Sequence, residues 1–126
     1  MNLDYIDNLN EFGENVVRLY NFDKSQAIKF RYLIEHTIVK NKQKLDLSKV
    51  DFIECRNCNL ILGLFKTDEG IFSKDNKTFF CALTLEGYQK MLKLLEPFCQ
   101  KETKGYQYLY EIDTLTDFLF SPAGTW

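Results

Sequence analysis

The chain has 126 residues and a formal net charge of −2; its hydrophobic content is 45% and its aromatic content 15%. This length is typical of one domain, and we expect residues 1–126 to form a single globular domain that needs no disulfides to fold. The composition excludes a disordered chain, and no stretch approaches the roughly 18–20 continuous apolar residues of a membrane span.

Both ends of the chain are acidic. Residues 1–14 carry four acids and no base, and residues 102–126 carry four acids and one base. A secretory signal has a basic start and an apolar centre, so the acidic start predicts a cytoplasmic protein whose cysteines stay reduced. The acidic ends indicate either solvated surface or a negative surface that is offered to a basic partner.

The first predicted elements are a strand and a helix. Residues 14–22 contain closely spaced apolar side chains and favour the strand, with the end of an N-terminal helix as the alternative. Asp23, with Gln26 three residues later, has the spacing of a capping box. Apolar residues then recur at helical spacing from Ala27 to Val39, and the lysines that follow suit the end of a helix dipole. We therefore predict a helix over residues 24–42.

The middle of the chain predicts β-structure. Residues 44–54 alternate in part, and residues 59–66 are apolar on both faces, which is typical of a central strand. The sequence TDEG at 67–70 is a hairpin turn signal, 71–73 starts the return strand, and 78–83 forms another strand after a second turn at 74–77. Together these segments predict an antiparallel meander.

The last third predicts a helix and one further strand. Thr84 is a candidate N-cap, and Pro97 should kink or end the helix that follows it. The apolar face of this helix comprises Leu85, Tyr88, Met91, Leu92, Leu95 and Phe98. Residues 105–113 alternate and predict a strand, while Pro122 and Gly124 break regular structure near the end. The predicted fold class is α+β, with a mainly antiparallel sheet (a β-meander) and two principal helices packed on it.

The sequence ECRNC at 54–58 is the one local pattern that suggests chemistry. Cys55 and Cys58 have the spacing of half a zinc site, but the remaining candidates, Cys81, Cys99 and His36, contain no second close pair. A redox pair would sit at a helix N-terminus, whereas a strand follows here. The pattern favours two small side chains at the start of a buried strand, without a cofactor. A zinc-stabilised domain built on this pair is the alternative.

We find no catalytic motif. His36 is the only histidine, and no local nucleophile or proton donor accompanies it. No phosphate-binding loop is present. The lysine- and arginine-rich stretch 24–49 is the one candidate for nucleic-acid binding, but the sequence pI of about 5.4 argues against a dedicated nucleic-acid binder. A small enzyme of unknown reaction, with an active site assembled from dispersed residues, is a second alternative.

The C-terminal sequence YLYEIDTLTDFLFSPAGTW (108–126) resembles small bacterial immunity proteins of polymorphic-toxin and contact-dependent inhibition systems. The shared features are a tyrosine-rich strand, the acidic EID and an aromatic ending. This resemblance implies a non-catalytic cytoplasmic protein that forms a tight complex with a cognate toxin domain, often a nuclease, and so neutralises it.

Toxin nucleases tend to be basic, so the resemblance implies contacts through acids, which speed association, and through aromatic anchors. The alternative for the tyrosines is a strand packed under a helix. The predicted partner-binding residues are Asp4, Asp7, Glu11, Glu14, Glu111, Asp113 and Asp117 among the acids, and Tyr106, Tyr108, Tyr110 and Trp126 among the aromatics.

Overall fold

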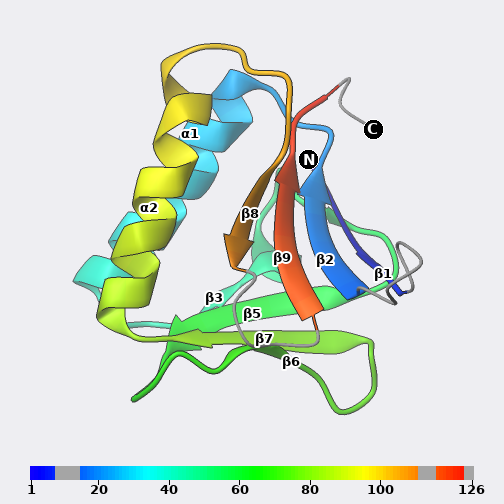
Figure 1. Cartoon of the computed structure of the whole chain (residues 1–126), viewed down its shortest axis with the longest axis vertical. Helices are drawn as coiled ribbons and strands as arrows, with labels where there is room; N and C mark the ends of the chain where they lie inside the picture. Colours follow the sequence, from blue (N-terminus) through cyan, green and yellow to red (C-terminus); the bar gives the residue numbers. More distant parts are fainter. Residues whose placement is uncertain (8–14, 111–115, 124–126) are drawn as a thin grey trace.

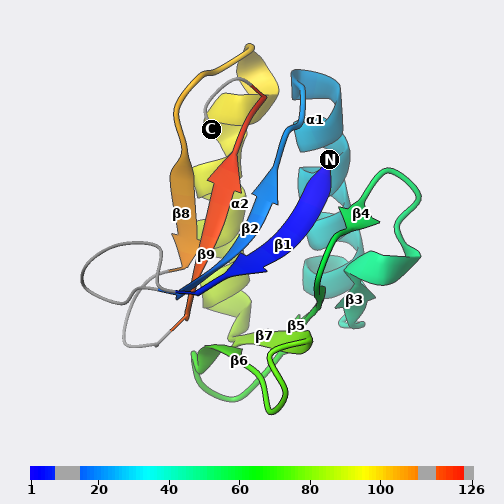
Figure 2. The same cartoon turned by 90° about the vertical axis from the view of Figure 1, so that its right-hand side faces the viewer.

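The fold is seen in a computed structural model that describes residues 1–7, 15–110 and 116–123. Two helices lie side by side and cover one face of a five-stranded sheet, while a four-stranded sheet crosses below them (Figure 1). Figure 2, turned by 90°, shows the five-stranded sheet in front of both helices. The α+β class with two principal helices is therefore confirmed.

The first sheet combines parallel and antiparallel pairs. Its strand order is β4-β1-β2-β9-β8 within the described residues. The strands are β1 (Asn2–Ile6), β2 (Asn15–Tyr20), β4 (Glu54–Cys55), β8 (Gln107–Tyr110) and β9 (Thr116–Ser121). β2 runs parallel to β9, and β1 runs parallel to β4, whereas the β1–β2 and β8–β9 pairs are antiparallel.

The second sheet is also mixed. Its order in the described chain is β3-β5-β7-β6, and β5 runs parallel to β7 while the two edge strands run antiparallel to their neighbours. The strands are β3 (Leu45–Asp46), β5 (Asn59–Leu64), β6 (Gly70–Phe72) and β7 (Thr78–Leu83). A short 3₁₀ helix, η2 (Leu47–Lys49), follows β3.

The predicted antiparallel meander is wrong, because β6 does not return along β5. β5 and β7 pair over six residues, whereas β6 offers only three. The longer apolar strand β7 takes the central position beside β5, and the short β6 takes the exposed edge, where a short strand limits unwanted pairing. At the turn, the Glu69 N–H donates to the Ala82 carbonyl, which holds this segment against β7.

The first helix begins where the sequence predicts but changes its geometry. α1 (Lys24–Leu33) has Asp23 as its N-cap, with the reciprocal hydrogen bonds to Gln26 that define a capping box. A π-helical turn, η1 (Ile34–Lys40), continues it, and the Asn41 N–H donates to the His36 carbonyl at 3.1 Å, five residues back. Residues 24–42 were predicted as one regular helix, whereas its second part is π-helical and ends at Lys40.

The second helix, α2 (Leu85–Gln100), is capped by Thr84, whose side chain accepts from the Gly87 N–H. α2 continues three residues past Pro97, where the missing N–H removes one intrahelical bond close to its end. Its apolar face is buried as predicted at Tyr88, Met91, Leu92, Leu95 and Phe98, but Leu85 is 37% exposed.

The core lies between the helices and the inner faces of both sheets. Leu3, Val17 and Phe118 contribute from the first sheet, and Leu62 and Phe79 contribute from the second. Two core strands, β1 and β9, were missed by the sequence analysis, and the segment 44–54 forms strand only at its ends.

Candidate interaction surfaces

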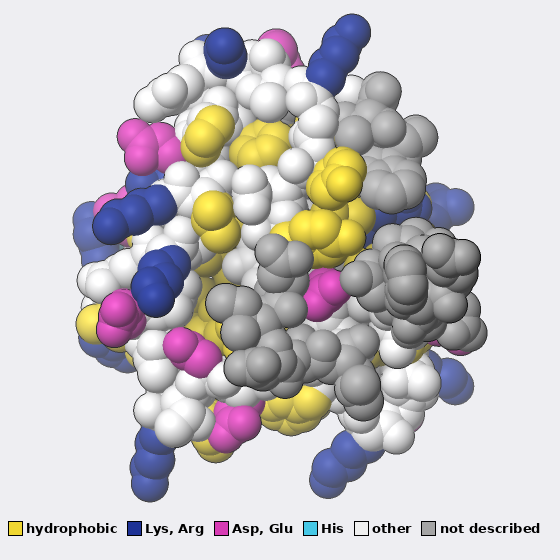
Figure 3. Space-filling view, viewed as in Figure 1, with side chains coloured by type: hydrophobic (Ala, Val, Ile, Leu, Met, Phe, Trp, Pro, Cys, Tyr) yellow, Lys and Arg dark blue, Asp and Glu magenta, His cyan; other side chains and the backbone are white. Residues whose placement is uncertain are grey.

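The outer face of the five-stranded sheet brings together residues that are far apart in the sequence. Asp4 pairs with Arg18 across β1 and β2, and Tyr108 pairs with Leu119 across β8 and β9. Their chain neighbours point into the core, so by strand alternation these residues face away from the helices. Figure 3 shows hydrophobic side chains at the surface over β8 and β9. The fold thus gathers several of the predicted partner-binding residues on one face.

The carboxylate of Asp4 is already paired within the chain. Arg18 donates to its two oxygens at 3.0 and 2.8 Å, and both side chains are only 14% exposed. The Arg18 guanidinium also lies 3.8 Å from the centre of the Tyr20 ring. Because this bidentate pair is largely shielded from water, Asp4 presents little net negative charge to a partner.

The tyrosines in and just before β8 are divided between two environments. The Tyr106 ring is 54% exposed and packs edge-on against Tyr108 at 5.8 Å, which suits an interface anchor. A bulge between Tyr108 and Tyr110 shifts the register, so Tyr110 pairs with Phe118 and packs against the core. Its hydroxyl donates to the Asp68 carbonyl at 3.4 Å.

Two further predicted partner-binding residues lie in the described part of the chain: Asp117, two residues before Leu119, is on the same outer face, and Asp7 follows the end of β1. Asp7 is exposed at the end of β1, and Asp117 is half-buried beside Val16. The remaining predictions lie outside the described residues and stay predictions: Glu11, Glu14, Glu111, Asp113 and Trp126.

The cysteine pair lies at the junction of β4 and β5. Cys55 is half-buried opposite Leu3, and Cys58 is 7% exposed in the core. Burial raises the pKa of Cys55, and it raises the pKa of Cys58 to about 12, so the thiols are protonated at neutral pH. Across residues 1–7, 15–110 and 116–123, no three His, Cys, Asp or Glu side chains are grouped as a metal site would require. His36 is exposed and stacks on Tyr32.

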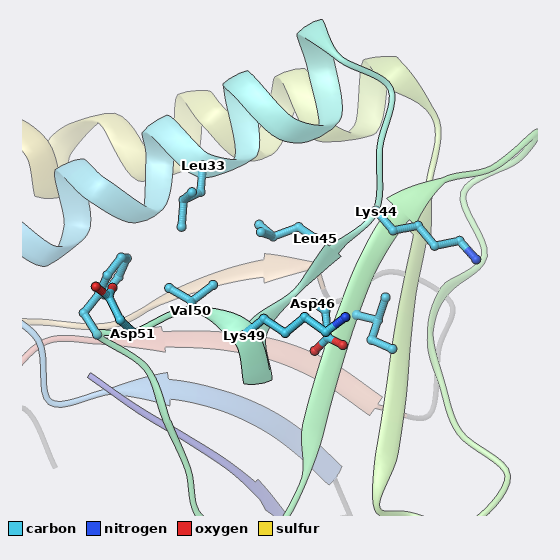
Figure 4. Close-up of a pocket in the computed structure, with 9 residues that line it drawn as sticks. Leu33, Lys44, Leu45, Asp46, Lys49, Val50 and Asp51 are labelled. Atoms are coloured by element: carbon cyan, nitrogen blue, oxygen red, sulfur yellow. The ribbon is translucent and has the colours of Figure 1, made fainter.

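A second surface was not predicted from the sequence. It consists of three hollows that share residues, and we call it the apolar belt. The corner hollow, with a volume of about 730 Å³, lies between α1 and the β3–η2 segment (Figure 4). It shares Leu33 and Phe52 with a helix hollow of about 380 Å³, and Lys44 and Ile61 with a sheet hollow of about 190 Å³.

The helix hollow is lined by exposed apolar side chains of α1. Ile28 is 44% exposed and Tyr32 is 59% exposed, and Leu33 and Phe52 complete the hollow. Lys29 holds its ammonium 5.8 Å from the centre of the Phe52 ring, a cation–π arrangement. A positive charge therefore stands directly beside the apolar surface.

The sheet hollow lies on the outer face of the four-stranded sheet. Ile61, Phe80 and Phe72 are neighbours across β5, β7 and β6, and Phe72 stacks with Phe80 at 5.7 Å. The next row has Gly63 beside Ala82, so the surface is lower there. Phe72 is 50% exposed, so a large aromatic side chain remains in contact with water.

Charged side chains border the corner hollow. Figure 4 shows Lys44, Lys49 and Asp46 near one end and Asp51 at the other. Burial alone would raise the pKa of Asp46, but hydrogen bonds from Ser48 and Asn59 outweigh it and lower the pKa below its usual value. The Asp46 carboxylate is thus held as an anion by its own neighbours.

Both surfaces expose aromatic side chains: Tyr106 on the first, and Tyr32 and Phe72 on the second. None of the helices in the described ranges has the length and apolarity that crossing a bilayer requires. Comparison of the chain with protein-family models, with curated proteins and with solved structures finds no match.

Proposed function

We propose that this protein is a non-catalytic binding domain that acts by forming a complex with another protein. The observation that supports this proposal best is the apolar belt, because water-exposed aromatic side chains such as Tyr32, Phe72 and Phe80 gather there. Exposed aromatic side chains that are grouped on one surface favour a binding role, because tyrosine and phenylalanine are enriched in interfaces.

We further propose that the partner is a cognate protein toxin, which the complex neutralises in the cytoplasm. The C-terminal resemblance to bacterial immunity proteins supports this identity. The exposed Tyr106 and its neighbour Tyr108 are the predicted anchors that the fold leaves at the surface. We also propose that this toxin is a nuclease.

The test is co-expression with the protein encoded by the adjacent upstream reading frame. We expect that protein alone to arrest growth, and co-expression of this chain to restore growth and yield a stable one-to-one complex on purification. Absence of toxicity together with absence of a complex would refute the toxin assignment. A stable complex without toxicity would leave a binding protein with a different partner class.

A further inference from the structure

We propose that the apolar belt binds an acidic segment of the protein partner. Apolar side chains of that segment occupy the hollows, and its carboxylates meet Lys29, Lys44 and Lys49. This inference rests on the proposed function, namely that the protein acts by binding another protein, and it identifies which surface docks and which chemistry it recognises.

The shape of the belt suits a chain segment. The three hollows follow one another from α1, past the β3–η2 segment, to the edge strand β6. A small molecule is usually enclosed by its pocket over most of its surface, whereas these hollows form an extended open path. A segment of protein chain can place successive apolar side chains along such a path.

The apolar anchors are available at both ends of the path. Tyr32 is 59% exposed at the helix end, and Phe72 is 50% exposed at the sheet end. Between the anchors, Gly63 and Ala82 keep the surface low, and the aliphatic part of Lys44 lies against Gly63. Because the Lys44 methylenes occupy the space over Gly63, a partner contacts Lys44, Ala82 and the flanking rings rather than the sheet backbone.

The charge beside the belt is positive. The described residues that line the three hollows include three exposed lysines, Lys29, Lys44 and Lys49, and two acids, Asp46 and Asp51, so the lining has a net charge of +1. Lys49 lies close enough to Asp46 to help lower the pKa of its carboxyl group. The Asp46 carboxylate is kept ionised by hydrogen bonds from Ser48 and Asn59, so it offsets part of the lysine charge at the corner hollow. Residues 24–66, which supply most of the belt, carry nine bases and four acids in a chain whose net charge is −2. Complementarity therefore favours a partner segment rich in Asp and Glu.

A protein segment fits this surface better than a nucleic acid does. Phosphate backbones are bound by rows of cations that track the strand, whereas the lysines here are interspersed along a surface made of aliphatic and aromatic side chains. The combination of an apolar floor with flanking cations is complementary to an amphipathic acidic peptide.

The first experiment uses the full chain, labelled with ¹⁵N, and short synthetic peptides. One set intersperses leucine and phenylalanine with glutamate, and the matched set has lysine at every glutamate position. We expect the glutamate peptides alone to shift the amide signals of Tyr32, Phe52, Ile61 and Phe80. Equal binding of the lysine peptides, preferential binding of a single-stranded oligonucleotide at the belt, shifts confined to the outer face of the first sheet, or no shift at millimolar peptide would each overturn the inference.

Charge reversal supplies a second, independent readout. The double variant K44E/K49E should weaken the glutamate peptides by about tenfold or more at low salt and should gain affinity for the lysine peptides. The control variant K93E/K101E makes the same charge change at exposed positions in and just after α2, outside the three hollows, and should leave both affinities almost unchanged. Equal effects of the two variants would overturn the inference, because net charge alone would then explain the binding.

The same variants separate this inference from the proposed function. If the toxin complex forms and K44E/K49E binds the toxin as tightly as the original chain, the proposed function stands and the belt is not the docking surface. If the peptides bind the belt with the expected charge preference but no toxin is neutralised, the docking surface stands and the toxin assignment fails.

Discussion

At the scale of single residues, Tyr88 joins three elements of the fold. It belongs to α2, and its ring is fully buried on the inner face of that helix. Its hydroxyl accepts from the Gly63 N–H of β5 at 2.9 Å and donates to the Cys81 carbonyl of β7. Burial raises the pKa of this phenol, so the hydroxyl keeps its proton and can donate. One oxygen atom thus satisfies polar backbone groups of two strands inside the core.

We expect Tyr88→Phe to lower the free energy of unfolding by about 1–3 kcal/mol, because the Gly63 N–H and the Cys81 carbonyl lose a buried partner. Urea denaturation of the two proteins measures this difference. The control is Tyr32→Phe at a 59% exposed ring, which should change stability by no more than about 0.5 kcal/mol. Equal losses in the two variants would contradict the role assigned to the Tyr88 hydroxyl.

The buried thiols give a second prediction at this scale. Burial raises the pKa of both Cys58 and Cys81 to about 12, so only a very small fraction of either thiol is ionised at pH 8. Because the thiolate is the reactive species, we expect Ellman's reagent to leave both cysteines unmodified in the folded protein and to modify them after urea is added. Mass spectrometry of digested protein assigns the sites. Rapid modification of Cys58 in the native protein would contradict its core position.

At the scale of elements, the β3–η2 corner is held by Asp46. Its carboxylate accepts from the Ser48 N–H at 3.0 Å, from the Ser48 hydroxyl at 2.7 Å and from the Asn59 amide at 2.8 Å. These bonds fix the start of η2 against the first residue of β5. They therefore position the wall of the corner hollow.

We expect the stability of this corner to depend on pH. The pKa of Asp46 is lower in the folded protein than in the unfolded chain, where it is about 3.9. The stabilisation that the ionised Asp46 provides is therefore complete above the unfolded-state pKa. It is lost as the pH falls through the folded-state pKa. Asp46→Asn retains an acceptor oxygen but does not titrate, so its urea midpoint should fall less between pH 5 and pH 3, as denaturation curves at each pH will show. An identical pH dependence in both proteins would contradict this account.

The sequence predicted the helices well because their signals are local. Asp23 and Gln26 form a capping box within four residues, and Thr84 caps α2 through the neighbouring Gly87. The π-helical geometry of η1 was not predicted, since apolar spacing alone does not distinguish it from an α-helix. Periodicity identifies the buried face, whereas the hydrogen-bond register also depends on what the helix packs against.

Strand pairing was predicted poorly because its causes are not local. β2 lies beside β9, which is distant in the sequence. β5 lies beside β7 rather than β6, although both candidate neighbours are apolar. β1 was missed because its acidic residues suggested surface, yet Asp4 is accommodated by Arg18 from β2. No single segment contains the information that pairs Asp4 with Arg18.

The same limit explains what was missed of the candidate site. The apolar run of β5 predicted a strand buried on both faces, but only Leu60 and Leu62 lie in the core, while Ile61 faces the belt. The predicted partner-binding residues followed instead from the C-terminal resemblance and were acids, tyrosines and Trp126. Exposure of an apolar side chain follows from which elements cover it, which the sequence pattern alone does not show.

At the scale of the whole molecule, charge is divided between two regions. Residues 24–66 carry nine bases and four acids, and the rest of the chain carries seven bases and fourteen acids. The belt is built mainly from the first region, whereas Asp7 and Asp117 on the first sheet belong to the second. The belt therefore favours an acidic partner region, and the first sheet favours a basic one. A single partner that contacts both surfaces would need one region of each charge.

The exposure of the belt is itself testable with two adjacent residues of β6. Ile71 and Phe72 point to opposite faces of the second sheet, and they are 4% and 50% exposed. Ile71→Ala should lower the free energy of unfolding by about 2–5 kcal/mol, because it leaves a cavity in the core. Phe72→Ala should cost less than about 1 kcal/mol, because water already reaches much of that ring. It should, however, weaken binding of the glutamate peptides.

Urea denaturation measures the first pair of effects, and peptide titration measures the last. If Phe72→Ala destabilises the protein as strongly as Ile71→Ala does, another part of the chain covers that ring, and the sheet hollow is closed to a partner. If stability is kept and peptide affinity is lost, the outer face of the second sheet has a role in binding rather than in folding. Position 72 would then be occupied by an aromatic residue because it contacts a partner, since a polar residue at this exposed edge would serve the fold equally well.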